Sequence, residues 1–305
     1  MQHIPVMLKE VLEWLEPKPG RAYIDCTLGL GGHTRALIEV AGEDGEFHGI
    51  ERDPLTFETT QAALSDFKNF TAHHARFSQI PDLIKLTKPL GGILLDLGIS
   101  SLQLSKSIYG LSFSPESHSE PLDMRLDPWC MLSAADILNH RTESELADLF
   151  WELADYPAAR PLARAIVQNR PLNTIGDLVK LCDRFRRPNS RLHPSTLPFM
   201  ALRMAVNDEL AEIEKALPKL IEWMEPEARI VVISFHSGED RIVKKCFKSA
   251  EGARRKKSKS AENSTFIRSE SGFRVLSPKP LIPGSQEIKV NPRARSAKMR
   301  VGEKY

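Results

Sequence analysis

Three carboxylates stand at the ends of short apolar segments in the first hundred residues. They are Asp25, Glu51 and Asp96. Carboxylates accept hydrogen bonds from hydroxyl and ammonium groups, and a carboxylate that is buried without a partner is costly. Asp96 lies inside the apolar run 93–97, so a site role is favoured over a structural one. The chemistry expected of this set is the binding of a ligand that carries hydroxyl groups and positive charge.

A glycine-rich turn follows the first of these carboxylates. It reads Leu-Gly-Leu-Gly-Gly-His over residues 28–33, and Glu51 lies twenty residues after Gly31. Glycines let the backbone approach a ligand closely, and a carboxylate at that distance can accept both hydroxyls of an adenosine ribose. The spacing departs from the G-x-G-x-x-G of dinucleotide sites, and Asp25 would repel a pyrophosphate. The pattern therefore favours S-adenosylmethionine, whose amino-acid end is cationic.

Two further side chains are candidates for this cofactor site. Phe77 follows the third predicted strand and could pack on adenine, although a place in the apolar core is the stronger alternative. Gln103 lies just beyond Asp96 and could point into the same cleft. No cysteine-based metal site is expected, because no two of the four cysteines lie closer than 52 residues.

Short apolar segments alternate with helical patterns in this first part. This alternation predicts an α/β fold with a parallel, doubly wound sheet. Strands are expected at 22–26, 47–51, 70–74 and 92–97, and helices at 5–15, 34–40, from 54 with Asp53 as N-cap, and 80–86.

The middle of the chain has a different pattern, rich in loops over 105–130 and helical over 133–216. Helices are expected at 133–138, 143–153, 158–168, 174–185 and 199–217, with N-caps at Ser133, Thr142 and Thr174. A strand at 229–235, a helix at 239–249 and a final strand at 291–301 then return to the first pattern. We therefore predict an inserted helical domain at 104–207, between residues 1–103 and 208–305 of one α/β domain.

Composition and charge limit the classes of protein to which the chain could belong. The 305 residues are 41% hydrophobic and 27% charged, which is typical of a globular chain. We expect no membrane span and no signal peptide, and the cysteine usage fits the cytoplasm. Residues 241–305 hold 18 Lys and Arg against 5 Asp and Glu, whereas residues 1–240 hold 24 against 35.

The basic final quarter suggests a polyanionic partner, most simply nucleic acid, and a solvated tail is the alternative. The segment 251–264 is expected to be a mobile basic loop. Candidate phosphate contacts are Arg184, Arg186, Arg187, Arg191, Arg293 and Arg295.

Six motifs together resemble the RsmH (MraW) family. They are HIPVML at 3–8, DCTLGLGGH at 25–33, LDLGISS at 95–101, PLDMR at 121–125, SFHSGEDR at 234–241 and NPRARS at 291–296. The resemblance covers nearly the whole chain. It implies a class I (Rossmann-like) S-adenosylmethionine-dependent methyltransferase with an inserted helical domain. Its substrate would be the exocyclic N4 amine of one cytidine in the decoding region of bacterial 16S rRNA.

The family pattern places cofactor contacts on seven residues of this chain: Gly31, Gly32, His33, Glu51, Phe77, Asp96 and Gln103. Glu51 stands where Asp is usual and Gly238 where Leu is usual. Tyr156, Leu197 and Met200 also depart from the pattern. These three lie in the inserted domain, so they affect the expected RNA contacts rather than the cofactor site.

The chemistry of the group that receives the methyl points to two candidate catalytic residues. Cytosine N4 is a poor nucleophile, so a group that accepts its hydrogens is useful. Asp96 is placed either to hold the cofactor or to receive the amine, and His236 could contact the substrate. Two other functions stay open: a non-catalytic RNA-binding assembly factor and a nicotinamide-dependent oxidoreductase. The substrate form, naked rRNA or assembled subunit, and the oligomeric state, including a homodimer, also stay open.

Overall fold

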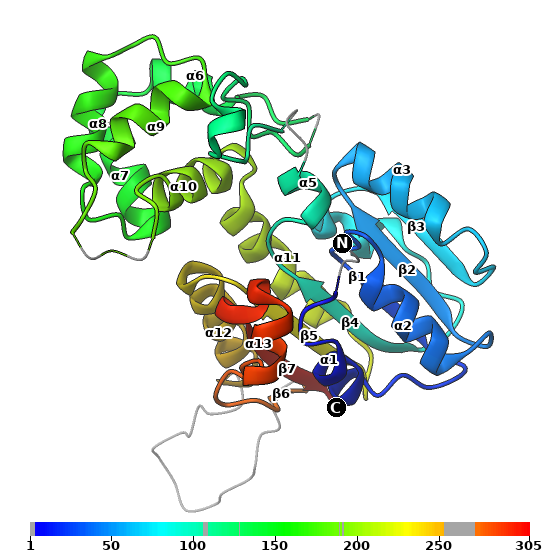
Figure 1. Cartoon of the computed structure of the whole chain (residues 1–305). Coiled ribbons are helices and arrows are strands. Elements are labelled where there is room, and N and C mark those ends of the chain that lie inside the picture. The colour runs from blue at the N-terminus through cyan, green and yellow to red at the C-terminus, as the bar shows by residue number, and fades with distance from the viewer. Residues whose placement is uncertain (1–3, 106–108, 128, 189, 191, 253–271) are drawn as a thin grey trace, which may run out of the picture. The chain divides into compact units, whose positions relative to one another are not determined.

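A computed structural model describes residues 4–105, 109–127, 129–188, 190, 192–252 and 272–305 of the chain. Internal contacts divide the chain into two compact units (Figure 1). The first unit comprises residues 1–98 and 210–305, and the second comprises residues 99–209. The sequence placed these boundaries after residues 103 and 207.

The first unit is built on one seven-stranded sheet with the order β3-β2-β1-β4-β5-β7-β6. The first five of these strands in that order are parallel, and β7 pairs antiparallel with both β5 and β6. This confirms the expected α/β class. The strands are β1 Ala22–Asp25, β2 Glu46–Glu51, β3 Phe70–His74, β4 Leu90–Asp96, β5 Arg229–Ser234, β6 Phe273–Val275 and β7 Lys298–Lys304.

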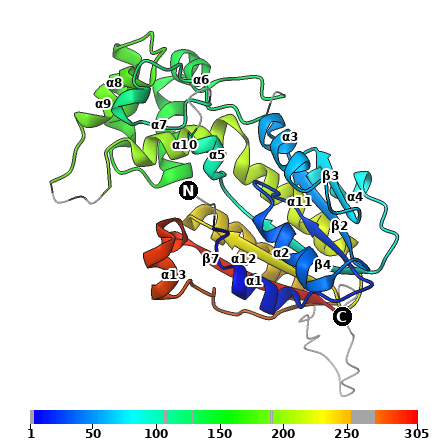
Figure 2. The ribbon, with the colours of Figure 1, turned by 45° about the vertical axis from the view of Figure 1, so that its right-hand side comes forward.

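Helices cover both faces of this sheet (Figures 1 and 2). On one face, apolar side chains of α4, α11 and α12 pack on Ile93 and Val232. On the other face, α1 and α2 pack on Tyr23 and Val231. Because alternate residues of a strand point to opposite faces, both faces of the central strands are buried. The helices are α1 Leu8–Leu15, α2 Gly32–Ala41, α3 Pro54–Ala63, α4 Ile80–Leu83, α11 Glu209–Trp223, α12 Ser237–Gly252 and α13 Ser285–Val290.

The second unit is helical in the part of the chain that the structure describes. Its N-caps Ser133, Thr142 and Thr174 were predicted correctly: each side chain accepts from the backbone N–H three residues further on. Asn207 ties the last part of the unit to the loop before α6, because its side chain accepts from the backbone N–H of Leu126 and donates to the carbonyl of Met124. The helices are α5 Ser101–Ser105, α6 Ala134–His140, α7 Glu143–Ala154, α8 Ala159–Gln168, α9 Ile175–Asp183 and α10 Thr196–Val206.

Four expected elements were wrong in their extent. The helix expected at 5–15 begins only at Leu8, because Met7 before it takes a left-handed φ of 53°. The helix expected at 80–86 ends at Leu83, because Ile84 is extended and leads the chain back towards the sheet. The single helix expected at 199–217 is two helices, α10 and α11, because Asp208 between them takes a left-handed φ of 50°. The strand expected at 291–301 begins only at Lys298, after the 3-10 helix Pro292–Ser296.

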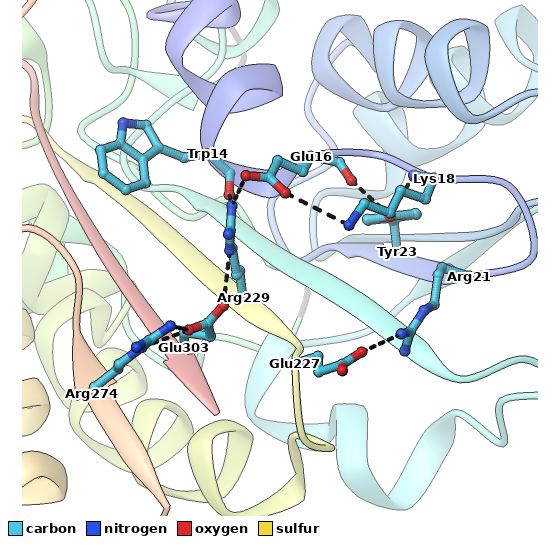
Figure 3. A network of polar contacts seen from close by, with 9 residues as sticks. All are labelled: Trp14, Glu16, Lys18, Arg21, Tyr23, Glu227, Arg229, Arg274 and Glu303. Carbon is cyan, nitrogen blue, oxygen red and sulfur yellow. Dashed lines mark hydrogen bonds and ion pairs between the residues drawn. The ribbon is translucent and has the colours of Figure 1, made fainter. Parts of the chain in front are cut away.

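A network of charged groups joins the strands at the edge of the sheet where the parallel strands begin (Figure 3). Arg229 opens β5 and contacts Glu303 of β7 at 3.2 Å, Glu16 at 2.7 Å and the carbonyl of Trp14 at 2.9 Å. Arg274 of β6 bonds the second carboxylate oxygen of Glu303 at 2.7 Å. The network ties the end of α1 to the antiparallel strands, on the edge opposite the strand-end carboxylates Asp25, Glu51 and Asp96.

Candidate functional site

The turn after β1 contacts all three of these acidic residues: it bonds the carboxylates of Asp25 and Glu51 and the backbone N–H of Asp96. The backbone N–H of Thr27 donates to Asp25 at 3.1 Å, and its hydroxyl accepts from the backbone N–H of Asp96 at 2.6 Å. The backbone N–H of Gly29 donates to Glu51 at 3.1 Å. Because β1, β2 and β4 are parallel neighbours, their carboxyl ends meet at one edge of the sheet, where ligands of such folds bind.

Glycine is required at two positions where this turn enters α2. Gly31 has a φ of +73°, and a Cβ there would lie 2.8 Å from the Leu64 side chain. At Gly32 the φ is unexceptional, but a Cβ would lie 2.5 Å from the ring of Pro5. Gly31 thus lets the chain turn, and Gly32 lets the N-terminal segment lie against the start of α2.

Glu51 is buried and fixed by backbone donors. Its Oε1 accepts from the backbone N–H of Asp53 at 2.9 Å, and its Oε2 is the acceptor for Gly29. Burial raises the pKa of this carboxyl to about 7. Each oxygen keeps a further lone pair, so an ionised Glu51 can still accept from two hydroxyls.

Asp96 is the least satisfied carboxylate of the site. Its Oδ1 is buried and has no hydrogen-bond partner among the residues that the structure describes. Burial, with the negative charges of Asp25 and Glu239 nearby, raises the pKa of Asp96 well above its usual range. Burial also raises the pKa of Asp25 to about 6. A cluster of acids that is costly to ionise favours a cationic ligand, because positive charge offsets that cost.

His33 connects this cluster to the start of the chain. Its Nε2 lies 3.0 Å from the carbonyl oxygen of Val6. A carbonyl can only accept, so Nε2 carries the proton, and Nδ1 faces Asp96 Oδ2 at 3.7 Å. Burial lowers the pKa of His33 to about 4, so the ring is neutral at pH 7.

The N-terminal segment that supplies this carbonyl is held by residues near the other end of the chain. Glu287 Oε1 accepts from the backbone N–H of Met7 at 2.7 Å, and the Asn291 amide donates to the carbonyl of Ile4 at 3.0 Å. We name residues 4–7 the N-terminal strap. The strap was not anticipated as part of the site, because the contacts that hold it are long-range.

His236 lies in the turn that follows β5. Its Nδ1 accepts from the backbone N–H of Gly238 at 3.2 Å, which leaves the proton on Nε2. That Nε2 lies 3.2 Å from Glu239 Oε1, but without hydrogen-bond alignment. Glu239 is itself buried and accepts from the backbone N–H of Phe235 at 2.7 Å. Glu239 therefore shapes the turn that presents His236.

Two of the expected cofactor contacts have other contacts in the structure. Phe77 is half-buried and packs against the apolar core of the first unit, as the structural alternative anticipated. Gln103 lies in the second unit, and its side-chain oxygen accepts from the backbone N–H of Ser100 at 2.9 Å. Both remain candidates for contact with a bound ligand.

The expected phosphate contacts differ in their surroundings. Arg184, Arg186 and Arg187 are exposed after α9, and Arg186 bonds Asp183 at 2.9 Å. Arg293 and Arg295 are exposed on the 3-10 helix Pro292–Ser296 rather than on a strand. Arg191 lies outside the described residues, as does the expected mobile loop 251–264 except for its first two residues, which end α12.

Two site residues were not singled out from the sequence. Thr27 bridges the ends of β1 and β4, and Glu239 orders the turn after β5. Both lie within motifs that carried the family resemblance, so the motifs were the available signal. The described residues contain no group of three or more His, Cys, Asp or Glu side chains placed to hold a metal ion. They also contain no helix long and apolar enough to cross a membrane.

Comparison with known proteins gives full-length matches. A model of the MraW methylase family matches residues 1–305. A relative from Dehalococcoides mccartyi named ribosomal RNA small subunit methyltransferase H is 39% identical, covering 99% of this chain and 86% of the relative. Proteins of the same name from Granulibacter bethesdensis and Nitratidesulfovibrio vulgaris are 38% and 39% identical. Each match covers 99% of this chain, with 91% and 95% of those relatives.

Proposed function

Because the chain belongs to the MraW methylase family, we propose that it is an S-adenosylmethionine-dependent methyltransferase of small-subunit ribosomal RNA. The acceptor is the exocyclic N4 amine of one cytidine in the decoding region of 16S rRNA. The observation that carries this proposal is the full-length family match on a chain whose three strand-end acidic residues are all bonded to the turn after β1. A nicotinamide cofactor is disfavoured, because these carboxylates would repel its pyrophosphate.

The carboxylates fit S-adenosylmethionine by charge and by hydrogen bonding. Bound there, the cofactor supplies an electrophilic methyl group on a sulfonium. Glu51 would accept the ribose hydroxyls, and Asp96, with its unpartnered buried Oδ1, would meet the cationic part. The backbone at Gly31, Gly32 and His33 would surround the amino-acid end, Phe77 would pack on adenine, and Gln103 is a further proposed contact of the cofactor.

The protein must also prepare a weak nucleophile. The N4 lone pair of cytosine is delocalised into the ring, so positioning it in line with the methyl group contributes about 7–11 kcal/mol. A group that accepts the N4 hydrogens favours a pyramidal amine. Asp96, at the end of β4, is the proposed acceptor, whereas His236, after β5, has Nδ1 occupied and a proton on Nε2 and is proposed to contact the substrate as a donor. Because burial raises its pKa, Asp96 must lose its own proton before it can take one from the amine.

The proposed partners follow from this acceptor. The substrate is 16S rRNA, and we place the reaction on the small ribosomal subunit, in the cytoplasm. Arg184, Arg186, Arg187, Arg191, Arg293 and Arg295 are the proposed RNA contacts. A homodimer is a further proposal, and light scattering of the purified protein tests it directly.

The decisive experiment measures the modified nucleoside. Mass spectrometry of 16S rRNA from cells that lack the gene should show loss of methylation at N4 of one decoding-region cytidine. A plasmid with the wild-type gene should restore it, and one with Glu51→Ala should restore less. Unchanged cytidine methylation in the deletion strain would reject the proposed acceptor. Binding of the RNA by purified protein without methyl transfer from labelled S-adenosylmethionine would support the assembly-factor alternative.

A further inference from the structure

The cationic residues of helix α12 lie on its exposed side, whereas its acidic residues are engaged in contacts with the rest of the protein. Four of its residues are cationic and exposed, at positions i, i+3, i+4 and i+7, which form one helical face. We name them the α12 stripe: Arg241, Lys244, Lys245 and Lys248. Val243 and Phe247 are buried in the core on the opposite side, so packing fixes the stripe towards solvent.

The acidic residues of the same helix are used internally. Asp240 binds the guanidinium of Arg300 at 2.6 Å, and Glu239 is the buried acceptor for the turn after β5. Glu251 accepts from the backbone N–H of Val275 at 3.0 Å. None of these carboxylates neutralises the stripe, and within the described ranges no stripe side chain forms a hydrogen bond or ion pair.

Three arginines of the first unit are instead neutralised by carboxylates. Arg229, Arg274 and Arg300 each meet a carboxylate. Four like charges spaced over about 10.5 Å of helix repel one another, and an anion that binds along them relieves that repulsion. A row of unneutralised cations fits a row of anions better than it fits a single anionic group.

The α12 stripe also lies close in sequence to the candidate site. Helix α12 begins at Ser237, directly after His236 at the end of β5. We propose that the α12 stripe binds consecutive phosphates of the substrate RNA and guides the strand that carries the target base towards the site. This inference rests on the proposed function and adds a binding surface to it, separate from Arg293 and Arg295.

The test compares two variants of equal charge. The stripe variant carries Arg241→Gln, Lys244→Gln, Lys245→Gln and Lys248→Gln. The control variant carries Lys68→Gln, Lys85→Gln, Lys215→Gln and Lys219→Gln; these lysines are exposed elsewhere in the first unit, two in loops and two on α11. Affinity for small ribosomal subunits from the deletion strain is measured at several salt concentrations, with melting temperature and S-adenosylmethionine affinity on the same preparations.

We expect the stripe variant alone to lose RNA affinity. The slope of log K against log salt should fall by about 3, because each phosphate contact contributes about 0.7–0.9. Its melting temperature and cofactor affinity should match those of the control. An unchanged slope, or an equal fall in both variants, would overturn the inference. Stripe-dependent binding to vesicles of anionic lipid, with the RNA slope unchanged, would assign the stripe to a membrane surface instead.

The outcome for the wild-type protein separates this inference from the proposed function. A wild-type protein that neither binds the subunits nor methylates them contradicts the proposed function itself. A wild-type protein that methylates them, together with a stripe variant that retains the full salt slope, contradicts only the role of α12.

Discussion

Glu287 fixes Met7 across 280 residues of sequence, through a 2.7 Å bond from the Met7 backbone N–H to its Oε1. Met7 directly follows Val6, whose carbonyl sets the proton of His33 on Nε2. His33 in turn presents an unprotonated Nδ1 to Asp96. The last part of the chain thus controls the protonation pattern of a candidate site residue through the N-terminal strap.

Glu287→Ala should therefore loosen the strap. It leaves the buried N–H of Met7 without an acceptor, which costs about 1–3 kcal/mol locally. We expect faster hydrogen exchange at Met7 and a several-fold weaker affinity for S-adenosylmethionine. Glu287→Gln keeps an acceptor oxygen and serves as the control. Equal cofactor affinity in wild type, Glu287→Ala and Glu287→Gln would show that the strap has no part in binding.

The contact between Gly32 and Pro5 gives a second test of the strap. Gly32→Ala places a methyl group 2.5 Å from the Pro5 ring, so the strap must move away from the start of α2. Cofactor affinity should fall, and Pro5→Ala in the same chain should restore part of it by removing the ring atoms that clash. Titration calorimetry on both single variants and the double variant measures the coupling. If the effects of the two substitutions on the binding free energy simply add, the new methyl group is accommodated without a clash with Pro5.

Glu51 should make cofactor affinity depend on pH. Its folded pKa of about 7 means that it is mostly protonated at pH 6 and mostly ionised at pH 8. Ribose hydroxyls bind the ionised form more strongly, since charge-assisted hydrogen bonds are the stronger ones. Affinity should rise between these pH values and then level off, while Glu51→Gln should bind more weakly with a flatter profile. A Glu51→Gln profile that parallels the wild type would exclude this role.

The same shift should appear in the stability of the cofactor-free protein. The folded pKa of Glu51 lies above its ordinary 4.5, so the folded state holds a proton that the unfolded state releases. This contribution is fully present below pH 4.5 and is lost as pH rises through 7. For Glu51 alone the loss is about 3 kcal/mol. Urea unfolding from pH 5 to 8 should show a steeper fall for wild type than for Glu51→Gln.

Local signals made most of the first unit predictable. Strand periodicity, the glycine turn and the Asp53 cap all depend on neighbours in sequence, and the strand at Phe70–His74 was predicted to the residue. The break at Asp208 was missed, because its left-handed backbone has no glycine to signal it. The ordinary propensities of the flanking segments favoured a continuous helix.

Contacts between distant segments were not accessible in the same way. No spacing rule connects Glu287 with Met7, or Arg300 with Asp240, since each pair forms only when the antiparallel end of the sheet is in place. The sequence therefore indicated the identity of the three strand-end carboxylates. It did not indicate that Thr27 would join the Asp25 carboxylate to the backbone of Asp96, or that the strap would orient His33.

The charged network around Arg229 provides a stability test that leaves the site intact. Arg229 is mostly buried between Glu303 and Glu16 (Figure 3), so Arg229→Met leaves Glu303 with Arg274 as its one cationic partner among the described residues. The expected loss of unfolding free energy is about 1–3 kcal/mol. This is smaller than the loss on breaking a fully buried pair, which is about 3–5 kcal/mol.

The matched control is Arg21→Met, which removes the more exposed ion pair with Glu227 at the same edge of the sheet. It should lower the unfolding free energy by less than about 1 kcal/mol. Because the network lies at the edge opposite Asp25, Glu51 and Asp96, affinity for S-adenosylmethionine should be unchanged in both variants. Equal losses of stability in the two variants, or a weaker cofactor affinity in folded Arg229→Met, would contradict this assignment.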